Sequence, residues 1–401
     1  MFSIQFLCIH LLYSLIYVLN CGVNMDISEE EKKAVMKVME SQLLSSLAGN
    51  VVENFEKEFA EYIGVKHAIA VNSGTAALHI SIASLDIGPG DEVIIPPYTF
   101  IATASSILHN NAIPIFADID NQSYTLDPES VKKKISNKTR AIIPVHLAGI
   151  TADMGPLLDI AKENNLHIIE DACQSHGAKY NGKKVGSIGD LGTFSFYPSK
   201  NMTTGEGGIV TTNSSKLARQ CRLLRHHGEP YWYAYNRLGW NYRMTEIQGA
   251  LGRVQLKKLD EYIRIRNENA QYLTDAVIDI SGIDPPYVPE YCEPAYNYWI
   301  GRIHPDVIGL DKDQFISKFP NSKILYPKPL YETKLFQKKI GYPKGCPWSC
   351  PFYGEEIDYT KINLPIVEKV AKEIFALDIY PGISKEELDD NISIMRKLAS
   401  K

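Results

Sequence analysis

Short apolar runs alternate with amphipathic segments from residue 68 to residue 212, and this alternation narrows the fold more than any other feature. The runs are Ala68–Val71, Glu92–Pro96, Ile113–Ala117, Ala141–Val145, Leu166–Glu170, Thr193–Tyr197 and Ile209–Thr212. Continuous apolar runs are typical of parallel strands that are buried on both faces. Strands that alternate with amphipathic helices build α/β folds. The sequence therefore predicts a mostly parallel central sheet with helices on both faces.

The chain is long enough for two domains, because 401 residues exceed what one hydrophobic core usually supports. Thr245 begins a long amphipathic segment, after which the pattern loosens into Pro- and Tyr-rich stretches. Two helices are predicted near the end, Pro365–Ala376 and Ser384–Leu398. We therefore expect a large domain at residues 25–265 and a smaller α+β C-terminal domain at residues 266–401.

Charge and cysteine content argue against two classes of protein. The net charge is -5 and no basic stripe is interleaved with aromatic residues, so a nucleic-acid partner is not expected. The seven cysteines are scattered, as in reduced cytosolic proteins. Cys346 and Cys350 form the one close pair. A zinc site needs further ligands, so no metal site is predicted.

The first 24 residues differ in composition from the rest of the chain. They are mostly apolar and contain no Lys or Arg, but Ser3, Gln5, His10 and Ser14 interrupt them. We favour a translation start near Met25, which leaves a cytoplasmic protein. Association with a membrane through residues 1–24, as an anchor or a signal, is the alternative.

Two reactive side chains follow predicted strands, Asp171 after Leu166–Glu170 and Lys200 after Thr193–Tyr197. Open α/β sheets place their sites outside the strand ends, so the two side chains could meet in one cleft. A lysine there is suited to forming a Schiff base with a carbonyl compound. Taken singly, a strand-end Asp is more often a helix cap and a lysine is more often solvated.

The segments EDACQSHGA and GTFSFYPSKNMTTGEGG resemble the DegT/DnrJ/EryC1/StrS family of pyridoxal-phosphate (PLP) aminotransferases, which have fold type I. The resemblance extends from about Ile27 to the C-terminus. It implies that Lys200 holds PLP covalently and later moves a proton between substrate and cofactor. It also implies ping-pong transfer of an amino group from glutamate or glutamine to a keto-sugar, often nucleotide-linked, or to a keto-cyclitol.

The resemblance also assigns cofactor contacts. It places the phosphate on Gly74, Thr75 and Ser195, the ring on Phe100, the ring nitrogen on Asp171, the phenolic oxygen on Gln174, and the partner subunit's phosphate on Asn241. The last assignment implies a homodimer with shared active sites. Each residue has an ordinary alternative: a helix cap for the Ser73–Thr75 turn, a core position for Phe100, a solvated loop for Gln174, a backbone contact for Ser195 and a turn for Asn241.

Some residues depart from the family pattern or leave alternatives open. Tyr331 stands where many relatives that act on nucleotide sugars carry histidine, so the acceptor is not assigned. Arg243 could bind an anionic substrate group, but pairing with Glu246 is favoured. Relatives that have histidine at the lysine position are dehydratases, so a PLP-dependent dehydratase or lyase is one alternative and a non-catalytic regulator is another. Retention of Lys200 and Asp171 favours the aminotransferase.

Overall fold

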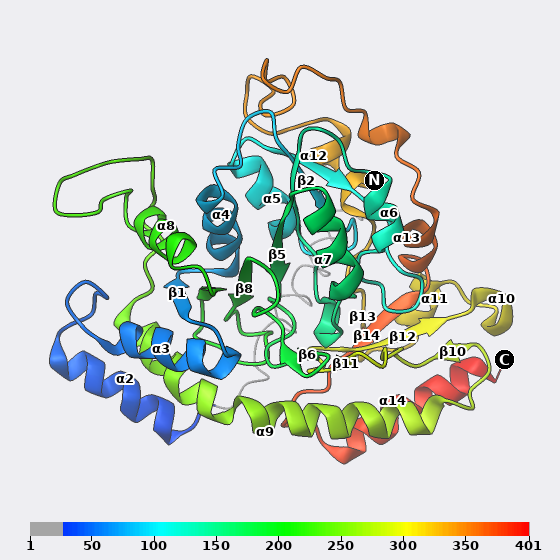
Figure 1. Ribbon diagram of the computed structural model, residues 1–401. Helices are drawn as coiled ribbons and strands as arrows, with labels where there is room; N and C mark the ends of the chain where they lie inside the picture. The colour runs from blue at the N-terminus through cyan, green and yellow to red at the C-terminus, as the bar shows by residue number, and fades with distance from the viewer. Residues whose placement is uncertain (1–26, 401) are drawn as a thin grey trace, which may run out of the picture.

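A computed structural model describes residues 27–400, and its central feature is a seven-stranded sheet in the order β1-β9-β8-β5-β4-β2-β3 (Figure 1). The strands are β1 (His67–Val71), β2 (Glu92–Ile95), β3 (Ile113–Phe116), β4 (Thr139–Ile142), β5 (His167–Asp171), β8 (Leu191–Ser195) and β9 (Gly208–Thr212). Neighbours from β3 to β8 run parallel, whereas β9 is antiparallel to both β1 and β8. The predicted α/β class is confirmed. The predictions for residues 1–24 lie outside the described residues.

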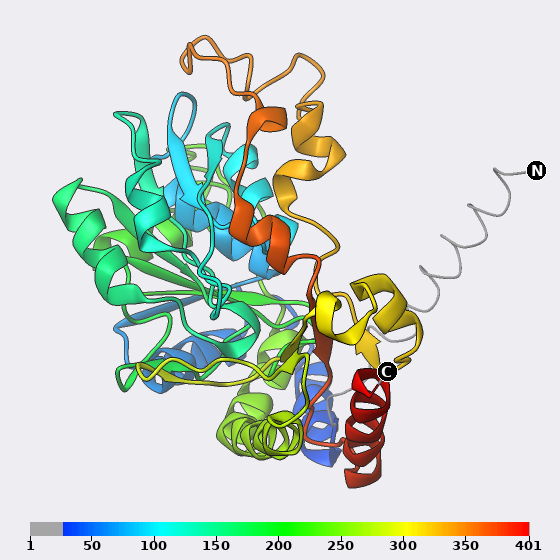
Figure 2. The ribbon, with the colours of Figure 1, turned by 90° about the vertical axis from the view of Figure 1, so that its right-hand side faces the viewer.

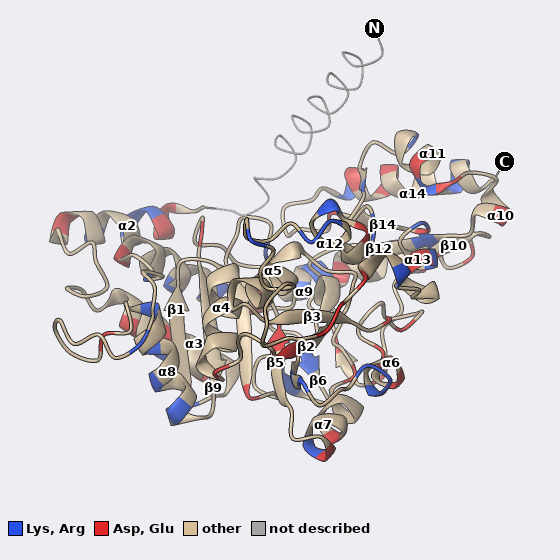
Figure 3. Cartoon of the chain, turned by 90° about the horizontal axis from the view of Figure 1, so that it is seen from above, with Lys and Arg blue, Asp and Glu red and all other residues tan. Residues whose placement is uncertain are grey.

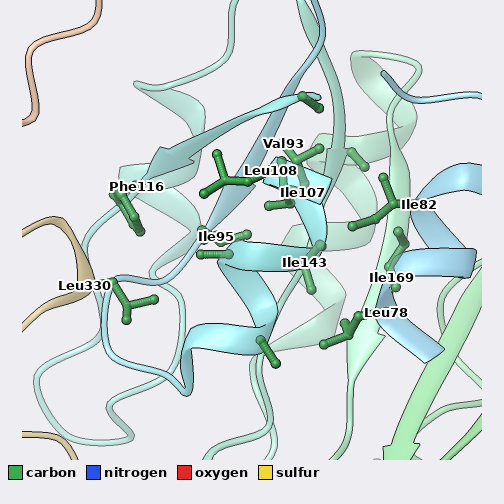
Figure 4. Packing of buried hydrophobic residues seen from close by; sticks show 14 of the residues in the cluster. Leu78, Ile82, Val93, Ile95, Ile107, Leu108, Phe116, Ile143, Ile169 and Leu330 are labelled. Carbon is green, nitrogen blue, oxygen red and sulfur yellow. The ribbon is translucent and has the colours of Figure 1, made fainter. Parts of the chain in front are cut away.

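Helices cover both faces of this sheet. They are α3 (Val51–Ile63), α4 (Gly74–Ser84), α5 (Ile101–His109), α6 (Pro128–Lys132), α7 (Met154–Glu163), α8 (Ser215–Arg225) and α9 (Glu246–Val277), and a further helix, α2 (Glu29–Ser41), packs against α9. Side chains of α4, α5 and α8 share one core with Val93 and Ile95 of β2 (Figure 4). Ile94, between them, packs instead with α7. Burial of successive residues on opposite faces explains the continuous apolar runs.

The last third of the chain adds a four-stranded antiparallel sheet, β10-β12-β14-β13, and short helices around it. Its strands are β10 (Ile283–Asp284), β12 (Trp299–Ile303), β13 (Ser322–Lys323) and β14 (Ile374–Leu377). The helices are α10 (Pro305–Ile308), α11 (Lys312–Ser317), α12 (Lys334–Gln337), α13 (Pro365–Val370) and α14 (Lys385–Ala399), with 3-10 turns η2 (Leu330–Glu332) and η3 (Tyr359–Lys361). A small sheet joins β11 (Cys292–Glu293) to β6 (Lys179–Tyr180) and β7 (Lys183–Lys184).

The predicted helix over residues 365–376 is wrong in its second half. Helix α13 ends at Val370, and Ile374–Leu377 form β14 between β12 and β13. Ile374 faces the core of the central sheet, whereas Phe375 and Leu377 face the C-terminal core. A short run buried on both sides forms a strand more readily than a helix with one apolar face.

Helix α9 runs along the base of the molecule and packs against α14 near the C-terminus (Figures 1 and 2). The expected boundary between residues 265 and 266 falls inside this helix. The division into domains 25–265 and 266–401 stays a prediction. Charged residues of both signs lie on the outer helices (Figure 3). Within residues 27–400, no helix combines the length and the apolar character that a bilayer span requires.

Candidate active site

Three of the residues expected at the site meet where β5, β8 and α4 approach one another. Asp171 is the last residue of β5 and pairs with Thr193 of β8. Ser195 ends β8, and Gly74 begins α4 directly after the turn that follows β1. A Cβ atom added to Gly74 would lie 2.7 Å from Cβ of Ser195. Only glycine permits this close approach, so the start of α4 packs directly against the end of β8.

The carboxylate of Asp171 is buried and is held by two hydrogen bonds. Its Oδ2 accepts a hydrogen bond of 2.8 Å from the hydroxyl of Thr103, on α5, and its Oδ1 accepts one of 3.2 Å from the amide of Cys173. Asp171 is therefore neither a surface acid nor the cap of a helix. Thr103 was not identified from the sequence, where it is one threonine among several in the stretch after Phe100.

Lys200 follows β8 and is half-buried. Burial lowers the pKa of its amine, and the neighbouring Cys173 and Asp171 oppose that shift. His176 lies nearby and is fully buried. Its own burial, together with the positive charge of Lys200, lowers the pKa of this imidazole to about 3, so it is neutral near pH 7. A lowered lysine pKa increases the fraction of neutral amine, which is the nucleophilic form.

The start of α4 has the features of an anion site. Ser73 caps the helix, its hydroxyl accepting a hydrogen bond of 3.1 Å from the amide of Ala76. Thr75 is half-buried in the first turn. The hydroxyl of Ser195 lies at the end of β8 beside this turn, and it also accepts a hydrogen bond of 3.4 Å from the amide of Tyr197. Amides and the dipole at a helix N-terminus favour negative charge, and a nearby hydroxyl adds a donor.

Gln174 is buried and hydrogen-bonded at both ends, so the alternative of a solvated loop residue is wrong. Its Oε1 accepts a hydrogen bond of 3.0 Å from the amide of Ala148, in the 3-10 turn η1 (Leu147–Gly149). Its Nε2 donates one of 2.9 Å to the hydroxyl of Tyr326, in the last third of the chain. Tyr326 carried no signal in the sequence, because its contact joins segments that are far apart along the chain.

Phe100 and Asn241 have exposed side chains. Phe100 precedes α5 and is 56% exposed, so the alternative of a core position is wrong. It lies three residues before Thr103, which reaches Asp171. The backbone of Asn241 forms an isolated antiparallel β-bridge with His226. The carbonyl of the next residue, Tyr242, accepts a hydrogen bond of 2.9 Å from the amide of Asn72. The segment that carries Asn241 therefore runs beside the turn between β1 and α4.

Arg243 and Tyr331 are two further residues that the sequence singled out. Nη1 of Arg243 lies 2.7 Å from Nδ1 of His226. Glu246 instead accepts hydrogen bonds from the amides that begin α3, so the favoured pairing of Arg243 with Glu246 is wrong. Tyr331 is buried in the core, where its hydroxyl donates a hydrogen bond of 2.8 Å to Glu368.

A buried carboxylate at one strand end and a half-buried lysine beyond the next strand lie on this α/β sheet as expected for an aminotransferase of fold type I. The sequence model of the DegT/DnrJ/EryC1/StrS aminotransferase family matches residues 25–396. The chain belongs to this family.

Similar proteins include a GDP-perosamine synthase of Caulobacter vibrioides, 48% identical over 59% of this chain and 64% of its own length. A pleiotropic regulatory protein of Geobacillus stearothermophilus is 36% identical over 90% of this chain and 92% of its own length. Among solved structures, DesV of S. venezuelae in complex with a ketimine intermediate has a TM-score of 0.83 and 32% identity, covering 93% of this chain and 95% of that one.

Proposed function

We propose that this protein is a PLP-dependent aminotransferase that moves an amino group from glutamate or glutamine to a keto-sugar. The observation that carries the proposal is the position of Lys200, whose pKa is lowered by burial, just after β8, the strand next to the one that ends in the buried carboxylate of Asp171. The GDP-perosamine synthase among the relatives supports a nucleotide-linked acceptor. A keto-cyclitol is the other acceptor class that we propose to test.

The polar groups of the site fit PLP by their chemistry. The turn at Gly74 and Thr75, together with the hydroxyl of Ser195, would hold the phosphate, because a helix N-terminus and a hydroxyl both donate to anions. Phe100 would lie against the ring, and Gln174 would contact the phenolic oxygen. PLP supplies an electron sink for the carbon that bears the amino group.

Asp171 and Lys200 would do the proton chemistry. The carboxylate of Asp171 would keep a proton on the pyridine nitrogen by charge pairing, and its own hydrogen bonds from Thr103 and Cys173 hold it in place. Lys200 would hold the cofactor and, once the amino donor displaces it, would carry a proton to and from the substrate carbon. Its lowered pKa suits this task, since a base works best with a pKa near the working pH.

We further propose a homodimer in which Asn241 reaches the phosphate site of the partner subunit. Two groups of exposed apolar side chains support this, one on the loop that follows α8 and one on α2 and the turn after it. They are Tyr231, Trp232, Tyr233, Tyr235 and Leu238, and Met36, Met39, Leu43, Leu44 and Leu47. The loop projects from the same side of the molecule as α2 (Figure 1). Exposed apolar surface of this kind marks a protein contact, and Asn241 lies just after the loop.

The alternatives lack a supporting observation at the site. A dehydratase of the histidine type lacks the amine that Lys200 provides. A silent regulator has no need of a buried carboxylate opposite a lysine, although one relative is named a regulatory protein.

The experiment uses the purified full-length chain with PLP. We expect a yellow protein whose visible absorbance falls when glutamate is added, and borohydride reduction that labels Lys200 in peptide mapping. Lys200→Ala should lose both signals, whereas Lys183→Ala, at an exposed position, should keep them. Turnover by Lys200→Ala, or a colourless wild-type protein in excess PLP, would contradict the proposal. The acceptor would then be identified by running the reaction in reverse. Amino sugars are supplied with 2-oxoglutarate, and formation of glutamate shows which amino sugar the enzyme accepts.

A further inference from the structure

Two buried asparagines hold the loop that carries Lys200. Nδ2 of Asn297 donates hydrogen bonds to the carbonyl of Ser199, at 2.7 Å, and to Oδ1 of Asn201, at 3.3 Å. Nδ2 of Asn201 in turn donates one of 2.7 Å to the carbonyl of Ala295. Each side chain therefore reaches into the segment that carries the other. Both partners of the Asn297 side chain at this loop are acceptor oxygens, so its NH2 group, and not its carbonyl oxygen, must face them.

The segment that carries Asn297 is itself held on two sides. The buried guanidinium of Arg266, on α9, donates through Nη1 to the carbonyls of Tyr296 and Asn297, both at 3.3 Å. None of the ion pairs within residues 27–400 joins Arg266 to a carboxylate. A buried cation is costly unless carbonyls or anions compensate it, so displacement of these carbonyls is unfavourable.

On its other side the segment bonds to the turn beside Gln174. The amides of Ala295 and Asn297 donate to the carbonyls of Gly149 and Ala148, at 3.1 and 2.9 Å. The amide of Ala148 donates to Gln174. One continuous set of hydrogen bonds thus joins the Lys200 loop, the entry to β12 and the turn that holds Gln174.

We infer that Asn201 and Asn297 are positioning residues that set where the Lys200 amine lies relative to Asp171. This inference rests on the proposed role of Lys200. The backbone of Lys200 is tied within its own loop by a hydrogen bond of 2.9 Å from its amide to the carbonyl of Tyr197. The two asparagines tie that loop to the rest of the molecule on either side of the lysine. Misplacement of a reacting group by about 1 Å can slow a reaction roughly 100-fold, so this anchoring matters for rate.

The test compares Asn297→Ala and Asn201→Ala with a matched control, Asn267→Ala. Nδ2 of Asn267, also on α9, donates to the carbonyls of Ile263 and Pro294, at 2.9 and 3.0 Å, so it holds the same connecting segment without touching the Lys200 loop. Each holoenzyme is mixed with excess glutamate, and the loss of visible absorbance is followed in a single turnover. The pH midpoint of the visible absorbance before mixing is the second readout, and bound PLP is quantified in each sample.

At equal PLP content, we expect Asn297→Ala and Asn201→Ala to react roughly 10- to 100-fold more slowly than wild type and to shift the absorbance midpoint. Asn267→Ala should stay within about twofold of wild type on the same scale. If Asn297→Ala and Asn201→Ala match Asn267→Ala in both readouts, the inference is wrong.

Two further measurements keep the test decisive. Asn201→Asp retains the shape of the side chain and the oxygen that accepts from Asn297, but it loses the donor to the carbonyl of Ala295. It should reproduce the slow rate even if an alanine variant does not fold. A wild-type rate for Asn201→Asp would overturn the inference. Borohydride labelling of the wild-type enzyme separates this question from the larger one. Label on another residue would overturn the proposed function. Label on Lys200, together with wild-type rates in the Asn201 and Asn297 variants, would overturn only the positioning role.

Discussion

The hydroxyl of Thr103 donates a hydrogen bond of 2.8 Å to Oδ2 of Asp171, and so joins helix α5 to the end of β5 inside the core. Thr103→Val keeps the shape but removes this donor to a buried carboxylate. A hydrogen bond to a charged group contributes about 1.5–3 kcal/mol, so we expect the glutamate half-reaction to slow by about tenfold or more. Stopped-flow absorbance measures the rate. Thr103→Ser keeps the hydroxyl and should stay near wild type; equal rates for the two variants would contradict the role of this bond.

The hydroxyl of Tyr326 accepts the hydrogen bond from Nε2 of Gln174. In Tyr326→Phe the buried amide would lose its acceptor, at a cost of about 1–3 kcal/mol. We expect weaker PLP retention, measured by dialysis and fluorescence titration. Tyr359→Phe is the matched control, because its buried hydroxyl donates to the carbonyl of Pro114 in the core. Equal PLP affinity in the two variants would show that Tyr326 does not support the site.

A shared active site makes a specific prediction for mixed subunits. Lys200→Ala and Asn241→Ala should each be inactive as homodimers. In a mixed dimer, the lysine of one chain meets the intact asparagine of the other, so one of the two sites is restored. After unfolding and refolding of an equal mixture, we expect about a quarter of wild-type activity. No recovery, with mixed dimers demonstrated by a mass tag, would place Asn241 outside the partner's site.

Acid sensitivity is expected from Glu31, which ties α2 to α9. Burial raises the pKa of this carboxyl, but hydrogen bonds from Lys258, Ser28 and Gln255 outweigh that and hold it at about 2, below the ordinary 4.5. Because folding lowers its pKa, the Glu31 carboxyl stabilises the fold at pH values above its ordinary pKa. This contribution is lost as the pH falls from about 5 towards 2. The difference between the two pKa values of Glu31 corresponds to roughly 3 kcal/mol in the free energy of unfolding.

Glu31→Gln should therefore be less stable than wild type at pH 7, and the gap should close on acidification. Urea unfolding at several pH values measures this. Glu163→Gln, on an exposed helical position, is the control and should track wild type. A gap that is independent of pH would show that the carboxylate charge does not contribute.

The sequence predicted those parts of the fold whose pattern is local. The parallel strands were recognisable because residues such as Val93, Ile94 and Ile95 are apolar in succession, and both faces of β2 are buried. The direction of β9 was not predicted, since strand polarity depends on the path of the chain between strands and not on the strand itself. The predicted helix over residues 365–376 wrongly includes most of β14, because the apolar residues of this strand follow α13 closely.

The site divides in the same way. Asp171 and Lys200 were identified because each sits inside a recognisable motif. Thr103, Tyr326 and Asn297 were missed, because each acts through a hydrogen bond to a residue far along the chain, and threonine, tyrosine and asparagine are common. Their importance is visible only once the strands bring those distant segments together.

The largest apolar core contains Leu330, Phe336 and Val367 alongside strand residues such as Val93 (Figure 4). The ring of Phe336 lies 5.2 Å from that of Phe116, at the end of β3. During synthesis the whole parallel sheet leaves the ribosome before the side chains that cover this edge. A nascent chain halted near residue 260 would therefore expose the apolar side chains of this edge, and such a chain is prone to aggregate until the last third is synthesised.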